Sequence, residues 1–254
     1  MNLYFDDSLA ARYASKSQQA RVMSESWLAA NLYCPGCGHH PLGRFVNGKP
    51  VADFFCSQCK EQFELKSKAG VTVGANVPDG AYQTMLARIR SDENPSFFFL
   101  AYRKTDYFVR QLVLVPRHFI TTEMIVPRAK GIPGRPGYIM CAMNMAALPE
   151  DGKILMIDQG CPAERKAVLR QWRKNLFLRG HKAAARGWLL AVMRCIEKLP
   201  DAFTLAQVYS FEAELRKSFP ANSHIKEKIR QQLQILRDQH LIEFMGGGNY
   251  RKAH

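Results

Sequence analysis

Two pairs of closely spaced cysteines constrain the fold of this sequence more than any other feature. Cys34 and Cys37 form one Cys-x2-Cys pair, Cys56 and Cys59 form the second, and 18 residues lie between the pairs. Each tight turn brings two thiolates together, so the four sulfurs can surround one Zn2+ tetrahedrally. A site filled by four cysteines has no open coordination position, and we therefore expect structural rather than catalytic zinc.

The other cysteines and the neighbouring histidines leave alternatives. His39 and His40 lie beside the first pair, and one of them could replace a cysteine as a ligand. We expect Cys141, Cys161 and Cys195 to be packed without a partner. The first ten residues, MNLYFDDSLA, lack the basic stretch and apolar block of a secretory signal, so we expect a cytoplasmic protein with reduced thiols.

The charge balance points to an anionic partner. The chain has 36 Lys and Arg against 22 Asp and Glu, a net charge of +14, and the excess is spread over its whole length. Nucleic acid is favoured over a membrane surface, since no amphipathic anchor is evident and no run of 18 apolar residues occurs. The alternative is a charge tuned only for solubility.

Acidic residues flank the second cysteine pair. Asp53 and Glu64 both sit among hydrophobic residues with strand composition, and the period of two in a strand puts Glu64 and Lys66 on one face. A hairpin with the second cysteine pair at its tip would place Asp53 opposite them. Two carboxylates can bind Mg2+ and a lysine can stabilise developing negative charge, which is what phosphodiester hydrolysis requires. The alternative is an exposed Glu64–Lys66 ion pair without catalytic meaning.

The remainder of the first 183 residues alternates helical and strand patterns. Residues 10–14, 21–30 and 81–90 read as helices, whereas 97–102, 108–115 and 153–158 read as strands, the first of them continuously apolar and hence buried on both faces. Residues 126–138 contain three Pro, three Gly and three basic residues, which predicts a loop able to lie along a phosphate backbone.

A basic segment follows these patterns. Residues 164–186 hold eight basic residues and one acid, together with Trp172 and Phe177. We weigh two interpretations equally: a solvated helix with a linker behind it, or an arm that contacts DNA.

The C-terminal part has the order of a winged helix. Residues 187–199 repeat apolar side chains at helical spacing, Thr204 and Gln207 fit a capping box, and residues 223–239 carry Ile225, Ile229, Leu233 and Leu236 on one stripe. The closing LIEFMGGGNYRK predicts two strands joined by a glycine turn. Three helices followed by a hairpin predict a DNA-binding module.

The third helix of this module is the natural reader of the major groove. Its outward residues include Gln231 and Gln234, and a Gln amide can bond both N7 and N6 of adenine. Basic neighbours would hold phosphates, whereas Glu227 and Asp238 argue against the whole face being a DNA surface; a solvated face is the alternative. We expect DNA contacts from Lys228, Arg230, Gln231, Gln234, Arg237, Tyr250 and Arg251, and from Tyr138 in the catalytic part.

Several strings resemble a known family. Pro50 and Asp53, followed by Glu64-Leu65-Lys66, are similar to the PD-(D/E)xK nuclease motif. From end to end the chain resembles the methyl-directed restriction endonucleases of this superfamily, through HHPLGRF, KPVADFFCSQCKEQFELKSKAG, PDGAYQTMLARI, NPSFFFLAY and HIKEKIRQQLQILRDQHLIEF.

The resemblance implies a fold, an activity and a set of ligands. The fold would be α/β (α+β), with a PD-(D/E)xK catalytic domain and its zinc site at residues 1–183 and a winged helix at 184–254. The activity would be that of a monomeric prokaryotic type II enzyme that cuts double-stranded DNA at GATC containing N6-methyladenine, by Mg2+-dependent hydrolysis. Asp53, Glu64 and Lys66 would be catalytic, with Mg2+ held by Asp53, Glu64 and the Leu65 carbonyl. Tyr138 stands where the family carries tryptophan; a ring can still stack there, but methyl discrimination can be weaker.

Two other classes compete with this hypothesis. A repair or recombination nuclease of the same fold would keep the chemistry and lose the methyl preference. A zinc-containing winged-helix regulator would explain the charge and the cysteines but leave Asp53, Glu64 and Lys66 as scaffold.

Overall fold

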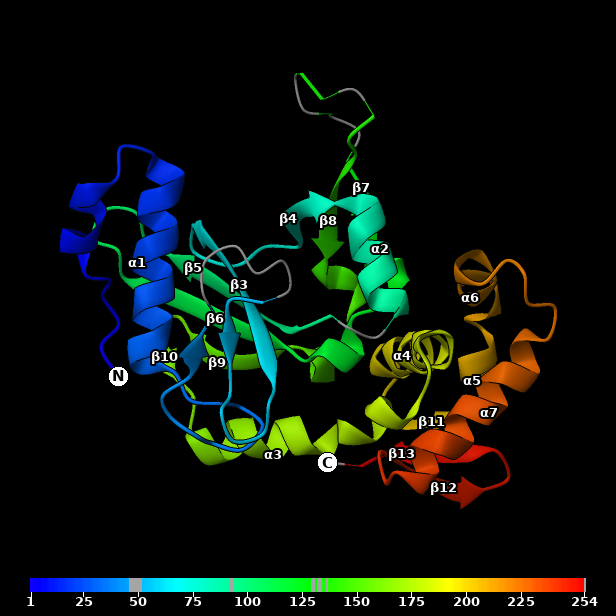
Figure 1. Cartoon of the computed structure of the whole chain (residues 1–254). Coiled ribbons are helices and arrows are strands. Elements are labelled where there is room, and N and C mark those ends of the chain that lie inside the picture. Colours follow the sequence, from blue (N-terminus) through cyan, green and yellow to red (C-terminus); the bar gives the residue numbers. More distant parts are fainter. Residues whose placement is uncertain (46–51, 92–93, 129–130, 132–133, 136, 254) are drawn as a thin grey trace.

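The computed structural model shows a mixed α/β domain followed by a smaller helix-turn-helix domain with its own sheet (Figure 1). The structure describes residues 1–45, 52–91, 94–128, 131, 134–135 and 137–253. Within these residues no helix is both long and apolar enough to cross a membrane. The helices are α1 (Lys16–Asn31), α2 (Tyr82–Arg90), α3 (Arg165–Lys174), α4 (Ala183–Glu197), α5 (Leu205–Tyr209), α6 (Glu212–Ser218) and α7 (Ile225–Asp238). Short 3-10 turns are η1 (Asp7–Arg12), η2 (Arg117–Phe119), η3 (Thr122–Met124), η4 (Met145–Ala147), η5 (Glu150–Gly152) and η6 (Leu176–Gly180).

A large mixed sheet forms the centre of the first domain. Its described strands are, in spatial order, β1 (Gly43–Arg44), β2 (Phe54–Phe55), β3 (Gln62–Ala69), β5 (Ser96–Tyr102), β6 (Val109–Val115), β9 (Ile154–Asp158) and β10 (Cys161–Pro162). The pair β3 and β5 is parallel, and the other neighbours are antiparallel. Every residue of β5 is buried, which confirms the strand expected to be covered on both faces.

The two faces of this sheet contribute side chains to two separate hydrophobic cores. Successive side chains of a strand point to opposite faces. Phe98 and Leu100 of β5 therefore pack with α1 and α3, whereas Phe97 and Phe99 pack on the other face in the core that contains α2 and α4. Residues of β3 follow the same alternation, so neighbouring side chains of that strand belong to different environments.

A second, antiparallel sheet lies beside α2 and carries the basic loop. Its strands are, in order, β4 (Asn76–Ala81), β8 (Met140–Asn144) and β7 (Ile125–Pro127). The predicted loop at residues 126–138 is thus shorter than expected, because Val126 and Pro127 pair with β8. The described remainder of the loop includes Tyr138 and projects away from the sheet at the top of Figure 1.

The C-terminal domain confirms the expected order of helices and hairpin. Thr204 and Gln207 make both hydrogen bonds of a capping box at the start of α5. Helix α7 buries its predicted stripe, from Ile225 to Leu236. The sequence did not predict β11 or the break between α5 and α6. The strands are, in spatial order, β11 (Ala202–Thr204), β13 (Asn249–Lys252) and β12 (Ile242–Gly246).

The predicted linker at residues 164–186 is wrong. The segment forms α3, η6 and the start of α4 in close succession, and Trp172, Leu178 and Arg186 are almost completely buried. Burying these large side chains fixes the segment against the sheet, so it is neither a linker nor a free arm. The outer face of α3 is exposed, as the helical interpretation expected.

Candidate active site and metal centre

Four cysteine sulfurs meet at one point, as the two pairs predict. Cys34 and Cys37 follow α1, whereas Cys56 and Cys59 lie between β2 and β3. Their Sγ atoms all lie within 4.8 Å of one another, with 3.5 Å between Cys34 and Cys59 and between Cys37 and Cys56. Sulfurs that share a tetrahedral zinc at about 2.3 Å are separated by roughly 3.8 Å. The cluster is therefore positioned to bind a metal ion.

The two cysteine turns have the same backbone geometry. In the first turn, the Gly38 N–H donates to the Cys34 carbonyl at 2.7 Å; in the second, the Lys60 N–H donates to the Cys56 carbonyl at 3.0 Å. Both donors have a positive φ, +84° at Gly38 and 63° at Lys60. Lys60 thus adopts a left-handed conformation that costs free energy in a non-glycine residue. The repeated turn indicates that the local structure is built to present two sulfurs each time.

Burial disfavours a thiolate at Cys34 unless a cation balances its charge. Cys34 and Cys56 are completely buried. Burial raises the pKa of the Cys34 thiol, although backbone N–H groups at Cys37 and Gly36 lower it in part. A positive metal ion would compensate the buried thiolate charge and make the four-cysteine site stable.

His39 and His40 have other partners. The Nε2 of His39 lies 2.9 Å from the Ser57 hydroxyl, and the Nδ1 of His40 lies 2.9 Å from the Leu32 carbonyl. Neither histidine belongs to the described metal-ligating cluster. The arrangement favours the four-cysteine interpretation over the histidine alternative.

The cysteine cluster closes the hairpin that carries the acidic residues. Phe54 of β2 pairs with Phe63 of β3, and the Asp53 N–H donates to the Phe63 carbonyl at 2.9 Å. The Leu65 N–H donates to Asp53 Oδ2 at 2.8 Å, so this carboxylate lies directly beside β3. The expected hairpin, with the second cysteine pair at its tip, is the one observed.

Glu64 and Lys66 point to the same face of β3 and touch. Lys66 Nζ lies 2.6 Å from Glu64 Oε1, and both side chains are largely buried. Glu64 also lies 3.4 Å from the guanidinium of Arg88 on α2. The pair is thus not the exposed surface ion pair of the alternative interpretation, but part of a half-buried cluster of charges.

Asp79 completes this cluster, and sequence reasoning missed it. Its Oδ1 accepts hydrogen bonds from Lys66 Nζ at 2.5 Å and from the Gly80 N–H at 2.7 Å. Asp79 belongs to β4, in the sheet that also carries the loop with Tyr138. The segment PDGAY looks like a turn in the sequence, so its aspartate gave no signal of a buried role.

Glu25 on α1 is a second missed acid. Its buried carboxylate pairs with Arg21 at 2.6 Å and with Arg44 at 2.7 Å. The charges of Glu25 and Arg21 act on Asp53 in opposite directions. No local pattern in the sequence connects this helix with Asp53.

Burial and charge set the protonation of the two central groups in opposite ways. Burial raises the pKa of the Asp53 carboxyl, and the hydrogen bond from Leu65 only partly offsets it. Burial alone would lower the pKa of Lys66, but Glu64 and Asp79 outweigh it, so the pKa of Lys66 is raised. Lys66 is therefore an ammonium donor here, and Asp53 gains from a nearby cation.

The expected DNA-contacting residues of α7 lie on its outer face. Gln231 and Gln234 are exposed. Lys228 donates to the Gln231 side-chain oxygen at 2.9 Å, whereas Arg230 and Arg237 pair with Glu227 and Asp238. These two acids, which argued against a fully basic face, thus neutralise part of the helix.

Two residues of the C-terminal hairpin that we expect to contact DNA, Tyr250 and Arg251, already have partners within the protein. Tyr250 is half-buried, and its ring packs on Phe203 and Phe244 with centroids 5.6 and 5.2 Å away. Arg251 is exposed but pairs with Glu243 at 2.5 Å. Tyr250 therefore holds the hairpin together.

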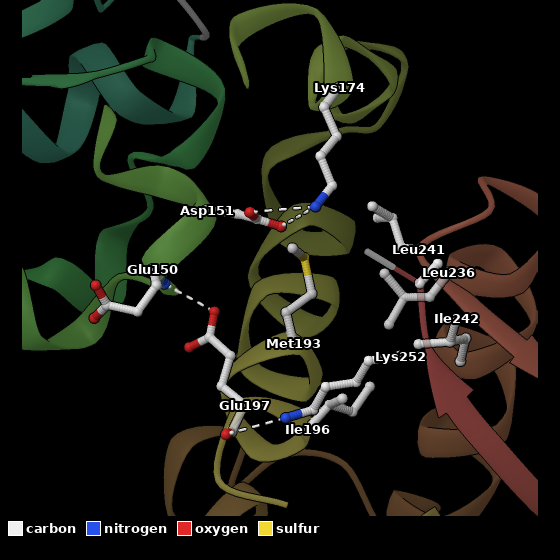
Figure 2. A pocket seen from close by; sticks show the side chains of 11 residues that line it. Glu150, Asp151, Lys174, Met193, Ile196, Glu197, Leu236, Leu241, Ile242 and Lys252 are labelled. Carbon is white, nitrogen blue, oxygen red and sulfur yellow. Dashed lines mark hydrogen bonds and ion pairs between the residues drawn. The ribbon is translucent and has the colours of Figure 1, made fainter. Parts of the chain in front are cut away.

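A cavity of about 250 Å³ lies between the two domains and is lined by residues of both (Figure 2). Met193 and Ile196 of α4 form its apolar wall, and the Glu150 N–H donates to Glu197 at its rim. None of Asp53, Glu64, Lys66 or the cysteines lines it. The residues that the sequence predicts to be catalytic therefore lie in the charged cluster on β3 and not at this cavity.

The helix-turn-helix domain indicates a DNA-binding protein. Its other domain is the α/β domain that carries the cluster of carboxylates and lysine. Residues 1–181 match the family model DpnI, described as the Dam-replacing family, and residues 184–252 match DpnI_C, the Dam-replacing HTH domain. The chain belongs to the DpnI Dam-replacing family. Membership implies a restriction endonuclease.

Replacing Cys56 by serine tests the metal centre. The variant removes one of four ligands, so we expect it to lose bound zinc. We also expect its free energy of unfolding to fall by about 4 kcal/mol or more, as is typical when a structural metal is lost. Elemental analysis gives the zinc content, and denaturant titration gives the stability. Cys161→Ser is the matched control, because Cys161 is exposed and outside the cluster. A full complement of zinc in Cys56→Ser would contradict the assignment.

Proposed function

We propose that the protein is a methyl-directed type II restriction endonuclease. It cleaves double-stranded DNA at GATC sites that contain N6-methyladenine, through Mg2+-dependent hydrolysis of the phosphodiester. We further propose that it acts as a monomer in the prokaryotic cytoplasm, where the cysteine thiols stay reduced.

The observation that carries this proposal is the cluster on the cysteine-closed hairpin. Asp53 lies beside the backbone of Leu65, and Glu64 and Lys66 meet on one face of the same strand. This is the set of groups that phosphodiester hydrolysis needs, and it stands in a chain of the restriction-enzyme family. The half-buried setting distinguishes it from a chance pattern of surface charges.

The donor set fits a hard divalent cation. Asp53, Glu64 and the Leu65 carbonyl offer oxygen ligands only, the type that Mg2+ prefers. The chemistry that Mg2+ supplies when bound is Lewis-acid neutralisation of the phosphate and a lower pKa for an attacking water. The raised pKa of Asp53, caused by burial, is consistent with a carboxylate that gains from a cation.

Lys66 takes the role of a hydrogen-bond donor. Its raised pKa keeps the ammonium charged, so it can stabilise negative charge on the phosphate or orient the water, but it cannot accept a proton. In the reaction, a water oxygen forms a bond to phosphorus, the bond to the leaving sugar oxygen breaks, and that oxygen takes up a proton. We propose that Asp79 positions Lys66 for this step.

Recognition of the target is assigned to two places. In the C-terminal domain, Gln231 and Gln234 on α7 face outward and suit adenine, with Lys228, Arg230, Arg237, Tyr250 and Arg251 near the backbone. In the catalytic domain, Tyr138 lies in the loop between β7 and β8, where its ring can stack on a base.

Cleavage of one plasmid prepared with and without adenine methylation at GATC tests the function. With Mg2+, we expect cutting of the methylated plasmid only, in fragments that map to GATC. Asp53→Asn should abolish cutting, because it removes a charged ligand, while the circular dichroism spectrum stays unchanged.

The other outcomes of this assay identify the competing classes. Equal cutting of both plasmids would indicate a nuclease without methyl preference. Cutting of neither, with DNA binding retained, would indicate a zinc-containing regulator.

Asp79→Asn tests the positioning of Lys66. The substitution keeps the shape and removes the charge that holds the ammonium, so we expect kcat to fall about 10- to 100-fold with KM nearly unchanged, as for a displaced catalytic group. Single-turnover cleavage and a binding titration without metal separate the two effects.

Asp106→Asn is the matched control, because that aspartate pairs with Arg103 on the surface. An unchanged kcat in Asp79→Asn, or a loss of DNA affinity equal to the loss of rate, would contradict the positioning role.

The double substitution Gln231→Ala and Gln234→Ala tests base reading by α7. We expect affinity for a duplex with methylated GATC to fall about 10- to 100-fold, the value of a lost bidentate contact, and affinity for random duplex to stay the same. Fluorescence anisotropy measures both affinities, and Gln239→Ala at the end of the helix is the control. Equal losses on both duplexes would show that these residues do not read bases.

A further inference from the structure

The outer face of α3 carries cations that the proposed active site does not use. Lys166, Arg170 and Arg173 are spaced by four and three residues, so they share one side of the helix. All three are exposed, and they lie along one surface of α3 together with Leu169 and Lys174. We call these three side chains the α3 stripe.

The α3 stripe has no compensating acid in the described part of the chain. Among the residues that the structure describes, no ion pair involves Lys166, Arg170 or Arg173, although the next residue, Lys174, pairs with Asp151; the exposed arginines of α7, Arg230 and Arg237, are paired with carboxylates. The surface of the C-terminal helix is thus partly neutralised, and that of α3 is not.

Helix stability accounts for Arg173, which lies in the last turn of α3 where a cation complements the helix dipole, but not for Lys166 and Arg170. Like charges three and four residues apart repel one another, and the first turn of α3 has no acidic residue to match the positive end of the helix dipole. Lys166 lies in that first turn. At Lys166 the sequence therefore keeps a positive charge where it weakens the helix, as expected of a residue that meets an external anion.

The cations are mounted on a rigid base. Trp172 of α3 is 2% exposed and packs in the core with Phe63. Gly36, in the first cysteine turn, lies so close to the Trp172 ring that a Cβ there would be 3.2 Å from it. Arg165 donates to the Gly38 carbonyl in the same turn. The metal centre thus fixes the position of the α3 stripe.

The spacing of the stripe suits a phosphate backbone. Seven residues of helix separate Lys166 from Arg173, a rise of about 10 Å. Phosphates of one DNA strand follow each other by about 3.4 Å along the axis, so the stripe spans roughly three of them.

The α3 stripe lies on the opposite side of the sheet from the catalytic cluster. α3 packs with Phe63 and Phe98 on one face, whereas Lys66 lies over Phe97 on the other, 6.0 Å from its ring centroid. Figure 1 shows α3 running along the foot of the domain, away from the loop between β7 and β8. A duplex at the stripe is not the stretch that is cut.

We propose that the α3 stripe binds the phosphate backbone of double-stranded DNA, without regard to sequence, at a place separate from the scissile bond. The inference rests on the proposed function in that the protein acts on DNA. It adds a capture surface that raises affinity for any duplex and keeps the enzyme near its target during search.

The test removes the three charges and measures the salt dependence of binding. The variant Lys166→Gln, Arg170→Gln, Arg173→Gln is titrated with a labelled 30-base-pair duplex that lacks GATC, between 50 and 200 mM salt (about the range in which counterion release is measured). Each lost phosphate contact reduces the slope of log K against log salt by about 0.9, so we expect a reduction of about 2 to 3. The positions of cleavage on methylated plasmid stay the same.

A matched triple variant controls for net charge. Arg12→Gln, Lys16→Gln and Lys104→Gln remove three exposed cations that have no described ion pair and lie outside α3, in η1, at the start of α1 and between β5 and β6. Their slope should stay close to that of the wild type. An equal slope change in both triple variants, or none in the α3 variant, overturns the proposal.

Folding of the α3 variant and DNA cleavage by the wild-type protein are measured as well. Zinc content and melting temperature show whether the α3 variant is folded. If it is not, the three substitutions are tested one at a time, and we expect each to change the slope by about 0.9. If the proposed function is wrong, the wild-type protein cuts no DNA. The comparison of salt slopes between the two triple variants stays valid in that case.

Discussion

The position of Asp53 beside Glu64 and Lys66 depends on the pairing of β2 with β3 across the cysteine turn. Strand β3 is also held by its parallel pairing with β5, whereas β2 is only two residues long and lies between β1 and β3. The four sulfurs tie the turn at residues 56–59 to the turn that follows α1, so the tip of the hairpin is held in place. Asp53 reaches the Leu65 N–H only in that register. A slip by one residue would turn Glu64 and Lys66 into the other core.

Local patterns predicted the parts of the molecule that local physics determines. The cysteine spacing, the apolar run of β5, the capping box at Thr204 and the stripe of α7 all follow from residues close in sequence, and the structure confirms them. The match to the Dam-replacing family and its HTH domain confirms the class that the longer strings suggested. The roles of Asp53, Glu64 and Lys66 stay predictions, although the structure brings them together.

Tertiary contacts decided the parts that were missed. Asp79 is 13 residues from Lys66 and belongs to a different sheet, so only the packing of the two sheets brings its carboxylate to the ammonium. The segment at residues 164–186 looks soluble from its charge, but Trp172 lies against Gly36, far away in sequence, and fixes it. Charge composition describes a surface, whereas a single buried aromatic residue determines whether the segment can move.

Helix α4 has a mechanical consequence for how one molecule can use two DNA-reading parts. Its apolar side chains, among them Trp188, Leu189 and Val192, belong to a core that runs without interruption from Phe97 in the catalytic sheet to Leu233 in α7. The two domains thus share one continuous hydrophobic core and are not joined by a flexible linker. If α7 reads bases and the cluster on β3 cuts, as proposed, this shared core holds the two sites at a fixed distance and angle, and a straight duplex engages both only where its geometry matches that arrangement. Otherwise the DNA must bend, or the two parts must hold different segments, and the gain from linkage is limited by geometry rather than by affinity.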